Sequence, residues 1–162
     1  MTLLEIIKQK RVHLNRLANT SGTLGEQSAV MSMESWVPRP QGKQLSTLLT
    51  ELAATGIHIK RFSFDAICTP VPLDFSDVTA LREVLPSLIF IEIKSANQSR
   101  VKPGFDGYFF ALTENEIQAA EQLGKRHKVA LFNRQTEELL LTSVPEILAR
   151  AKSTTWQLSI QL

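Results

Sequence analysis

The hydrophobic positions in the N-terminal part of the chain follow a helical period. Between residues 2 and 18, leucine and isoleucine recur with polar residues between them, at a spacing that predicts an amphipathic helix. A second helix is expected over about 23–37, because Thr23 can cap its first turn and Glu26 stands at the capping-box spacing. A third helix is expected over 43–54. The pattern therefore predicts helices before any strand.

Two hydrophobic runs in the middle of the chain are typical of β-strands. The first run covers residues 57–68, and the second covers 88–94, with the sequence Leu-Ile-Phe-Ile-Glu-Ile-Lys. Successive side chains of a strand point to opposite faces, so Glu92 and Lys94 share one face while Ile93 lies on the other. A carboxylate and an ammonium group are therefore expected on the same surface of the sheet.

The first run carries a further carboxylate at Asp65. If the two runs pair as neighbouring strands, Asp65 lies close to Glu92 and Lys94. Two carboxylates suit Mg²⁺, which keeps several waters and takes one or two protein carboxylates together with substrate phosphate oxygens. The lysine can orient or activate a water, or neutralise charge on the phosphate. The pattern indicates phosphodiester hydrolysis with Mg²⁺ as cofactor and Mn²⁺ as its substitute.

This arrangement resembles the active-site motif of a known nuclease superfamily. The order Asp65, then Glu92-Ile93-Lys94, is similar to the motif of the PD-(D/E)xK nucleases. The aromatic segment 107–116, the expected helix after it and the apolar segment 129–132 resemble the C-terminal type domains of NO VEIN proteins, a branch of that superfamily. The resemblance covers roughly residues 22–133. It implies an α/β fold with a restriction-endonuclease-like mixed β-sheet flanked by helices.

The resemblance also implies roles for individual residues. Asp65 and Glu92 would hold the metal ion, the carbonyl of Ile93 would add a ligand, and Lys94 would position or activate the attacking water. The implied activity is that of a metal-dependent deoxyribonuclease.

Many members of the superfamily supply another acidic residue from a helix before the first core strand. Gly25-Glu26 resembles the opening of that helix in resolvase-like members, which makes Glu26 the expected catalytic residue. Against this role, Glu26 also stands where it can serve as the capping-box partner of Thr23, and Glu51 in the third helix lies closer in sequence to the two strands. Both alternatives stay open at this stage.

The rest of the chain predicts alternating helices and strands. The expected elements are a helix over 77–85, a strand over 108–112, a helix over 114–123 capped by Thr113 and Glu116, a strand over 128–133, a helix over 145–152 and a strand over 156–162.

The bulk composition fits one nuclease-like domain. The chain has 162 residues, a formal net charge of +2 and a sequence pI of about 8.8. We expect helices over 1–56, a core sheet with the motif over 57–133, and a helix and strand over 134–162. The sequence contains no block of basic residues of the kind typical of nucleic-acid binding. A DNA-binding surface would therefore have to form from basic residues that folding brings together. Arg100 and Lys102, in the polar loop after the motif, are the expected phosphate contacts.

Other reactive side chains predict no second site. The three histidines match no zinc spacing and are expected at the surface. Cys68 is expected to be a buried, inert thiol. The N-terminus shows an amphipathic helix where a signal peptide would be uniformly apolar, and no run is long enough to span a bilayer. We therefore expect a cytoplasmic protein without a membrane partner.

Two functional hypotheses follow. The first is a DNA-cleaving enzyme, for which symmetric cutting of a duplex would require a homodimer. The alternative is a catalytically inactive nuclease-fold module that binds DNA or protein within a larger assembly, beside a partner subunit.

Overall fold

A five-stranded β-sheet organises the protein. The computed structural model describes residues 2–9, 33–97, 100–155 and 157–162. The strands lie side by side in chain order: β1 (Trp36–Pro38), β2 (Ala66–Cys68), β3 (Ile89–Ala96), β4 (His127–Asn133) and β5 (Glu138–Thr142). β3 and β4 run parallel, whereas the other neighbouring pairs are antiparallel. The expected mixed sheet flanked by helices is confirmed.

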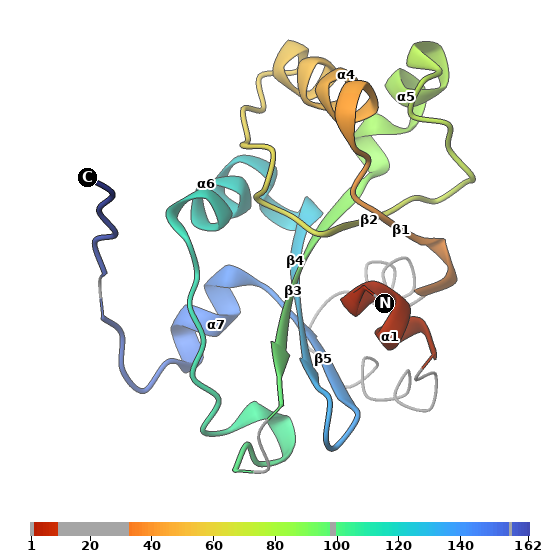
Figure 1. Cartoon of the computed structure of the whole chain (residues 1–162). Coiled ribbons are helices and arrows are strands. Elements are labelled where there is room, and N and C mark those ends of the chain that lie inside the picture. The colour runs from red at the N-terminus through yellow and green to blue at the C-terminus, as the bar shows by residue number, and fades with distance from the viewer. Residues whose placement is uncertain (1, 10–32, 98–99, 156) are drawn as a thin grey trace.

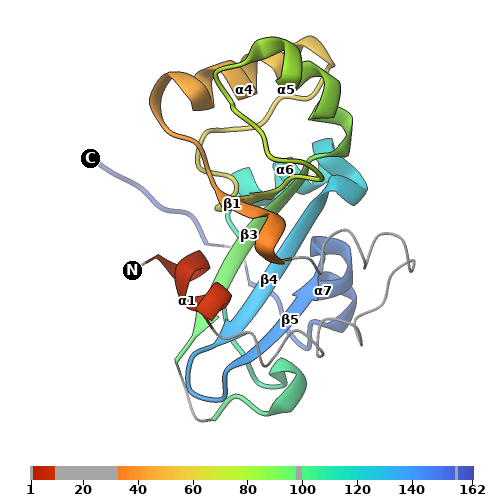
Figure 2. The same ribbon diagram turned by 90° about the vertical axis from the view of Figure 1, so that its right-hand side faces the viewer.

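Helices cover the sheet and one of its ends. They are α1 (Leu3–Gln9), α4 (Gly42–Ala54), α5 (Val78–Val84), α6 (Glu114–Leu123) and α7 (Val144–Arg150). Short 3-10 turns lie at Met33–Ser35, Leu85–Ser87, Pro103–Phe105 and Gly124–Arg126. α4 and α5 lie together at one end of the sheet (Figure 1). α1 and α7 lie on opposite sides of it (Figure 2).

Apolar side chains bury the centre of the sheet on both faces. On one face, Ile91 and Ile93 pack in a cluster that includes Leu4 and Ile7 of α1. On the other face, Phe90 packs in a cluster with leucines of α4, α5 and α6. Burying a side chain of this size fully contributes roughly 1.5–3 kcal/mol relative to leaving it exposed. β3 is thus the central strand of the core, and polar residues within it require an explanation.

Local signals predicted several elements correctly. The expected helix over 43–54 is α4, and the expected helix over 77–85 is α5, which Asp77 caps by accepting a hydrogen bond from the Ala80 amide at 3.1 Å. Thr113 and Glu116 form the predicted capping box at the start of α6. Each of these signals depends on residues only three or four positions apart, so distant contacts do not alter it.

The expected strand over 57–68 is mostly a loop. Only its last three residues form a strand, β2. The cause is local: the amide and hydroxyl of Ser63 both donate to the Lys60 carbonyl, at 3.3 and 2.7 Å. These bonds close a turn and take the place of ladder pairing. The segment before Asp65 is therefore free of the sheet.

The second expected helix is wrong at its end. Trp36–Pro38 forms β1, and Trp36 pairs with Cys68 across the ladder. Pro38 has no amide hydrogen to donate, which an edge strand tolerates. The core sheet therefore extends outside the expected 57–133 on both sides, through β1 and β5. Residues 10–18 of the first expected helix and 23–32 of the second lie outside the described residues.

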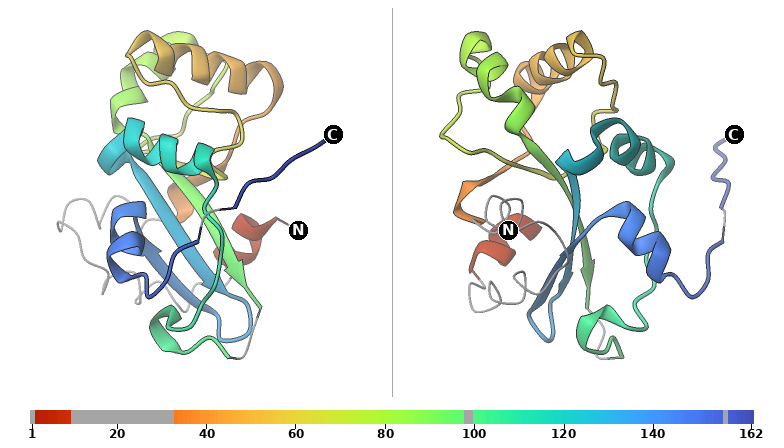
Figure 3. Two further views of the ribbon diagram at one scale, coloured as in Figure 1. Left: turned by 90° about the vertical axis from the view of Figure 1, so that its left-hand side faces the viewer. Right: turned by 180° about the vertical axis from the view of Figure 1, so that it is seen from behind.

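Two further expected strands are wrong. Residues 108–112 join no strand; the rings of Tyr108 and Phe110 stack with centroids 4.9 Å apart and pack against the core through side chains. Residues 157–162 also form no strand, and Leu158, Ile160 and their neighbours are exposed. The chain after α7 runs away from the sheet (Figure 3). Alternation alone cannot supply the partner that a strand needs.

Two other expectations concern single residues and the membrane. Cys68 is buried as expected, and burial raises the pKa of its thiol. Within the described residues, no helix has the length and apolar character needed to cross a bilayer.

Candidate active site

Asp65 is joined to β3 by its main chain and its side chain. Its amide donates to the Ile91 carbonyl, and its Oδ2 accepts from the Ile93 amide, both at 2.8 Å. Ala66 pairs with Ile91 in the antiparallel ladder, so one further step of the register places Asp65 opposite Glu92. Asp65 is nevertheless exposed to solvent. It lies at the open side of the candidate site.

Glu92 and Lys94 lie on the same face of β3, as the strand period predicts. The Lys94 Nζ atom lies 3.3 Å from Glu92 Oε1. Glu92 is 6% exposed, whereas Lys94 is partly buried. The structure therefore brings together the three side chains that the sequence singled out, from the residue just before β2 and from the middle of β3.

Glu116 of α6 is a member of this cluster that sequence reasoning did not find. Its Oε1 accepts a hydrogen bond from Lys94 Nζ at 2.8 Å, while its Oε2 accepts one from the Thr113 amide at 2.9 Å. The capping box was the visible signal for this residue. The capping bond occupies one carboxylate oxygen of Glu116 and orients the other toward β3. The local sequence does not reveal that this second oxygen binds Lys94.

The cluster holds an excess of negative charge. Burial raises the pKa of Glu92 to about 8, and the carboxylates of Asp65 and Glu116 act in the same direction, while Lys94 opposes them. Burial disfavours the charged form of Lys94, but its bonds to Glu116 and Glu92 outweigh burial and raise its pKa. Burial, together with the presence of only one ammonium among these carboxylates, keeps Glu92 largely protonated near neutral pH. An added cation would favour its ionised form.

His127 lies behind the cluster, at the first position of β4. It is 2% exposed, and neither ring nitrogen has a hydrogen-bond partner among the described residues. Burial lowers its pKa to about 4, although the charge of Glu116 and the nearby Ser63 backbone favour the protonated ring. The expectation of a surface histidine is wrong here, because His127 pairs beside Phe90 in the core. His58 is exposed as expected, and His13 lies outside the described residues.

The other predicted site residues lie elsewhere. Glu26 is outside the described residues. Glu51 on α4 forms an ion pair with Arg82 of α5, its Oε2 lying 2.8 Å from Arg82 Nε. Glu51 is thus paired on the helical side of the molecule and not, among the described interactions, with the Glu92–Lys94–Glu116 cluster, whose charged side chains pair with one another. Arg100 and Lys102 belong to the segment after β3. β3 ends on the side of the sheet opposite α4 and α5 (Figure 1).

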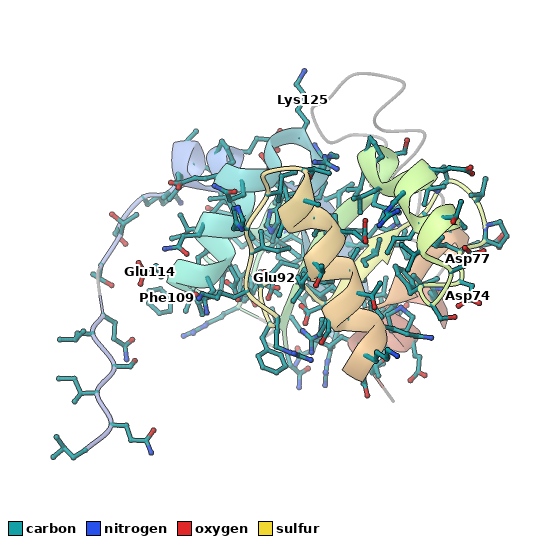
Figure 4. The ribbon with its side chains drawn as sticks, turned by 90° about the horizontal axis from the view of Figure 1, so that it is seen from above. Asp74, Asp77, Glu92, Phe109, Glu114 and Lys125 are labelled. Atoms are coloured by element: carbon teal, nitrogen blue, oxygen red, sulfur yellow. The ribbon has the colours of Figure 1, made fainter. Side chains whose placement is uncertain are left out.

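Within the described part of the chain, no group of three or more His, Cys, Asp or Glu side chains is arranged to hold a metal ion. Figure 4 shows Glu92 inside the molecule, with Phe109 and Glu114 on one flank and Asp74 and Asp77 on the other. Asp74 and Asp77 serve local turns: Asp74 accepts from Ser76 at 2.9 Å, and Asp77 caps α5.

Comparisons with known proteins identify no relative: no family model matches the chain, and no curated protein or solved structure is significantly similar to it. Only the geometry and chemistry of the cluster therefore bear on the function of the protein.

Proposed function

We propose that the protein is a metal-dependent deoxyribonuclease of the PD-(D/E)xK, restriction-endonuclease-like type. One observation carries the proposal. Asp65, just before β2, is bonded to β3 beside Glu92, and the Lys94 Nζ atom lies 3.3 Å from Glu92 Oε1 on the same face of β3. Opposed carboxylates with a lysine beside them are the side chains that phosphodiester hydrolysis with a divalent cation requires.

The donor set fits Mg²⁺, with Mn²⁺ as a substitute. Asp65, Glu92 and the Ile93 carbonyl would hold the ion through hard oxygen atoms, which Mg²⁺ prefers. Burial raises the pKa of Glu92, and the carboxylates of Asp65 and Glu116 raise it further against the effect of Lys94, so a cation would find uncompensated negative charge here. When bound, the ion would supply charge stabilisation for the phosphate. A site with only two carboxylate ligands leaves Mg²⁺ free to keep bound waters and to contact the substrate phosphate.

The polar side chains of the cluster have distinct roles in this proposal. Lys94 holds a positive charge next to Glu92 and neutralises charge that develops on the phosphate, or orients the attacking water. Glu116 fixes the position of the Lys94 ammonium through the 2.8 Å bond. Asp65 is exposed, so the substrate approaches from its side. His127 is neutral near pH 7 and adds no charge.

Metal binding tests the proposal without any choice of substrate. We expect Mn²⁺ to bind the wild-type protein in a water-proton relaxation or calorimetric titration, and Asp65→Asn to lose that binding. Asp74→Asn is the matched control, because it removes an exposed carboxylate that lies far from Glu92 (Figure 4). Equal binding by wild type and Asp65→Asn would contradict the proposed metal site.

Cleavage tests the role of the lysine. We expect Lys94→Ala to lose Mg²⁺-dependent cleavage of linear, nicked or branched DNA by at least about a hundredfold. The fold should persist, because Glu92 and Glu116 can share a proton when the ammonium is absent. Lys125→Ala removes an exposed lysine at the periphery and should cleave as wild type (Figure 4). Cleavage retained by Lys94→Ala would remove this lysine from the mechanism.

A second candidate is a catalytically inactive nuclease-fold module that binds DNA or protein within a larger assembly. One observation favours it: the Lys94 ammonium lies between two carboxylates and thus has its partners within the protein. This module would bind its partner equally well with or without divalent metal, and Asp65→Asn would leave its function unimpaired.

The proposal also covers partners and location. DNA is the substrate, a homodimer or partner subunit would allow symmetric cutting of a duplex, and we place the protein in the cytoplasm. Its one cysteine, buried in the core, suits a reducing compartment.

A further inference from the structure

An exposed aromatic ring stands three residues before Asp65 in the chain. Phe62 is 72% exposed, and the guanidinium carbon of Arg39 lies over its ring at 4.9 Å from the centroid. Arg39 is itself held in place, because its Nη1 donates to the Phe64 carbonyl at 2.7 Å and its amide donates to the Asp65 carbonyl at 3.0 Å. We call Arg39 and Phe62 the Arg39–Phe62 platform. It is joined directly to the main chain of the candidate active site.

Further cations lie in the loop that carries Phe62 and at the start of the helix that follows Arg39. Lys60 and Arg61 precede Phe62 in the same exposed loop, and Lys43 lies in the first turn of α4. The Arg61 Nη1 atom lies 3.4 Å from Ser46 Oγ, which holds the guanidinium against α4. Among the residues that the structure describes, none of these three cations, nor Arg39, forms a salt bridge. Their charge is therefore available to an anionic partner.

The pairing of an open ring with unpaired cations favours one kind of ligand. Leaving a phenylalanine exposed forgoes the roughly 1.5–3 kcal/mol that its burial would contribute. Proteins that bind single-stranded nucleic acid place exposed aromatic rings in a basic groove, where bases stack on the rings and cations contact the phosphates. In a duplex the base faces are stacked on one another and cannot reach such a ring. Unpaired bases are the matching ligand.

We propose that the Arg39–Phe62 platform stacks an unpaired base of single-stranded DNA while Lys60 and Arg61 contact its phosphates. Phe62 stands three residues before Asp65, so at most about 11 Å of extended chain separates them. A base on the ring and a phosphate at Asp65 thus belong to one short stretch of strand. The substrate is DNA with a single-stranded segment at the cleavage point, an assignment that rests on the proposed function.

Phe109 provides a matched control for Phe62. It is 76% exposed, slightly more than Phe62. In the described part of the chain, no arginine or lysine lies over its ring. The two phenylalanines therefore differ in their charged surroundings and not in exposure. A specific platform predicts that only Phe62 contributes strongly to binding.

The test measures binding without cleavage. Fluorescence anisotropy gives the Kd of the full chain for a fluorescein-labelled single-stranded oligothymidine and for a duplex, in EDTA and at fixed salt. We expect Phe62→Ala to weaken single-strand binding about tenfold or more, the effect of removing one stacking ring. Phe62→Trp keeps a stacking surface and should bind within about twofold of wild type. Phe109→Ala should bind as wild type.

Salt dependence separates stacking from phosphate contact. The combined change Lys60→Ala and Arg61→Ala should reduce the slope of log K against log salt by about 1.4, the value for two phosphate contacts on a single strand. Phe62→Ala should weaken binding with the slope unchanged. A changed slope in Phe62→Ala, or an unchanged slope in the double variant, would overturn the assigned roles.

Other outcomes overturn the inference itself. They are unchanged single-strand binding by Phe62→Ala, an equal loss in Phe109→Ala, or tighter binding of duplex than of single strand. Because EDTA removes any metal, these results do not depend on catalysis. If binding depends on Phe62 but no DNA is cleaved with Mg²⁺, the platform stands and the nuclease proposal fails. If cleavage occurs without dependence on Phe62, the nuclease proposal stands and the platform fails.

Discussion

The two faces of β3 have opposite chemistry within one strand of eight residues. Ile91 and Ile93 point to the face that α1 covers, where they pack in an apolar cluster. Glu92 and Lys94 point to the face that α6 covers, where they meet Glu116. Both faces are largely covered at this point, but only the apolar face of Ile91 and Ile93 stabilises the fold by hydrophobic burial. The strand period therefore assigns residues to faces, while the covering helix decides what each face can do.

The charged face opposes folding. Removing ions from water costs several kcal/mol each, and mutual attraction offsets that cost only with good geometry. The raised pKa of Glu92 fits an incomplete offset, because burial and neighbouring carboxylates favour the protonated form. Apolar residues would fill these positions without that cost. The charged cluster therefore supports a functional site more than a structural one.

The largest expected effect comes from the apolar face. Ile91 is fully buried, so Ile91→Ala should lower the free energy of unfolding by about 2–5 kcal/mol through lost burial and a cavity. Urea denaturation followed by circular dichroism measures it. Ile160→Ala, at an exposed position, should change stability by less than about 0.5 kcal/mol. A loss below 1 kcal/mol for Ile91→Ala would show that this face is not tightly packed.

The charged face of β3 should make the free energy of unfolding depend on pH. The pKa of Glu92 is about 8 in the fold against an ordinary 4.5, so the folded state binds more protons between these values. Stability should therefore fall as pH rises through this window, by at most about 1.4 kcal/mol per pH unit. Glu92→Gln should remove that slope and be the more stable protein at pH 8. A steeper loss in the variant would contradict the assigned shift.

His127 should give the free energy of unfolding the opposite dependence on pH. Its pKa is about 4 in the fold against an ordinary 6.5, so the unfolded state binds more protons between these values. Stability should be lost as pH falls through this window, by roughly 3 kcal/mol in total. His127→Leu should flatten acid unfolding measured by urea titration at several pH values. Between about 4.5 and 6.5 the slopes of Glu92 and His127 oppose each other, so the single variants are needed to separate them.

The smallest expected effect concerns the helix that closes the charged face. Thr113 caps α6 by accepting a hydrogen bond from the Glu116 amide at 3.2 Å. Thr113→Ala should lower the free energy of unfolding by about 1 kcal/mol, the usual contribution of an N-cap. Thr47→Ala is a control within α4, where the hydroxyl bonds the carbonyl one turn back. Equal stability of wild type and Thr113→Ala would mean that packing alone holds α6.

Sequence reasoning succeeded where the signal was local. α4 and α6 were predictable because amphipathic spacing and capping residues act within one or two turns of a helix. Strands were mispredicted where their formation depends on pairing with a neighbouring strand. Residues 57–65 are apolar enough for a strand but form a turn, and 157–162 alternate correctly but have no neighbouring strand. β1 escaped prediction for the same reason, since its pairing with β2 is a long-range contact.

The candidate site divides in the same way. Asp65, Glu92 and Lys94 were found from strand period and from resemblance to a nuclease motif. Glu116 was assigned only its cap, and His127 was expected at the surface. Similarly, Arg100 and Lys102 were favoured for DNA contact by their place after the motif. The Arg39–Phe62 platform became visible only through contacts between residues far apart in the sequence.

The sequence by itself determined which residues of β3 share a face, because side-chain alternation follows from backbone geometry alone. It also determined where α6 begins, because a cap involves only near neighbours. The tertiary structure decided which groups meet across those elements: Asp65 beside β3, Glu116 against Lys94, and His127 within the core. The physical reason is that packing depends on side chains from many distant positions at once, and only the folded chain brings them within bonding distance.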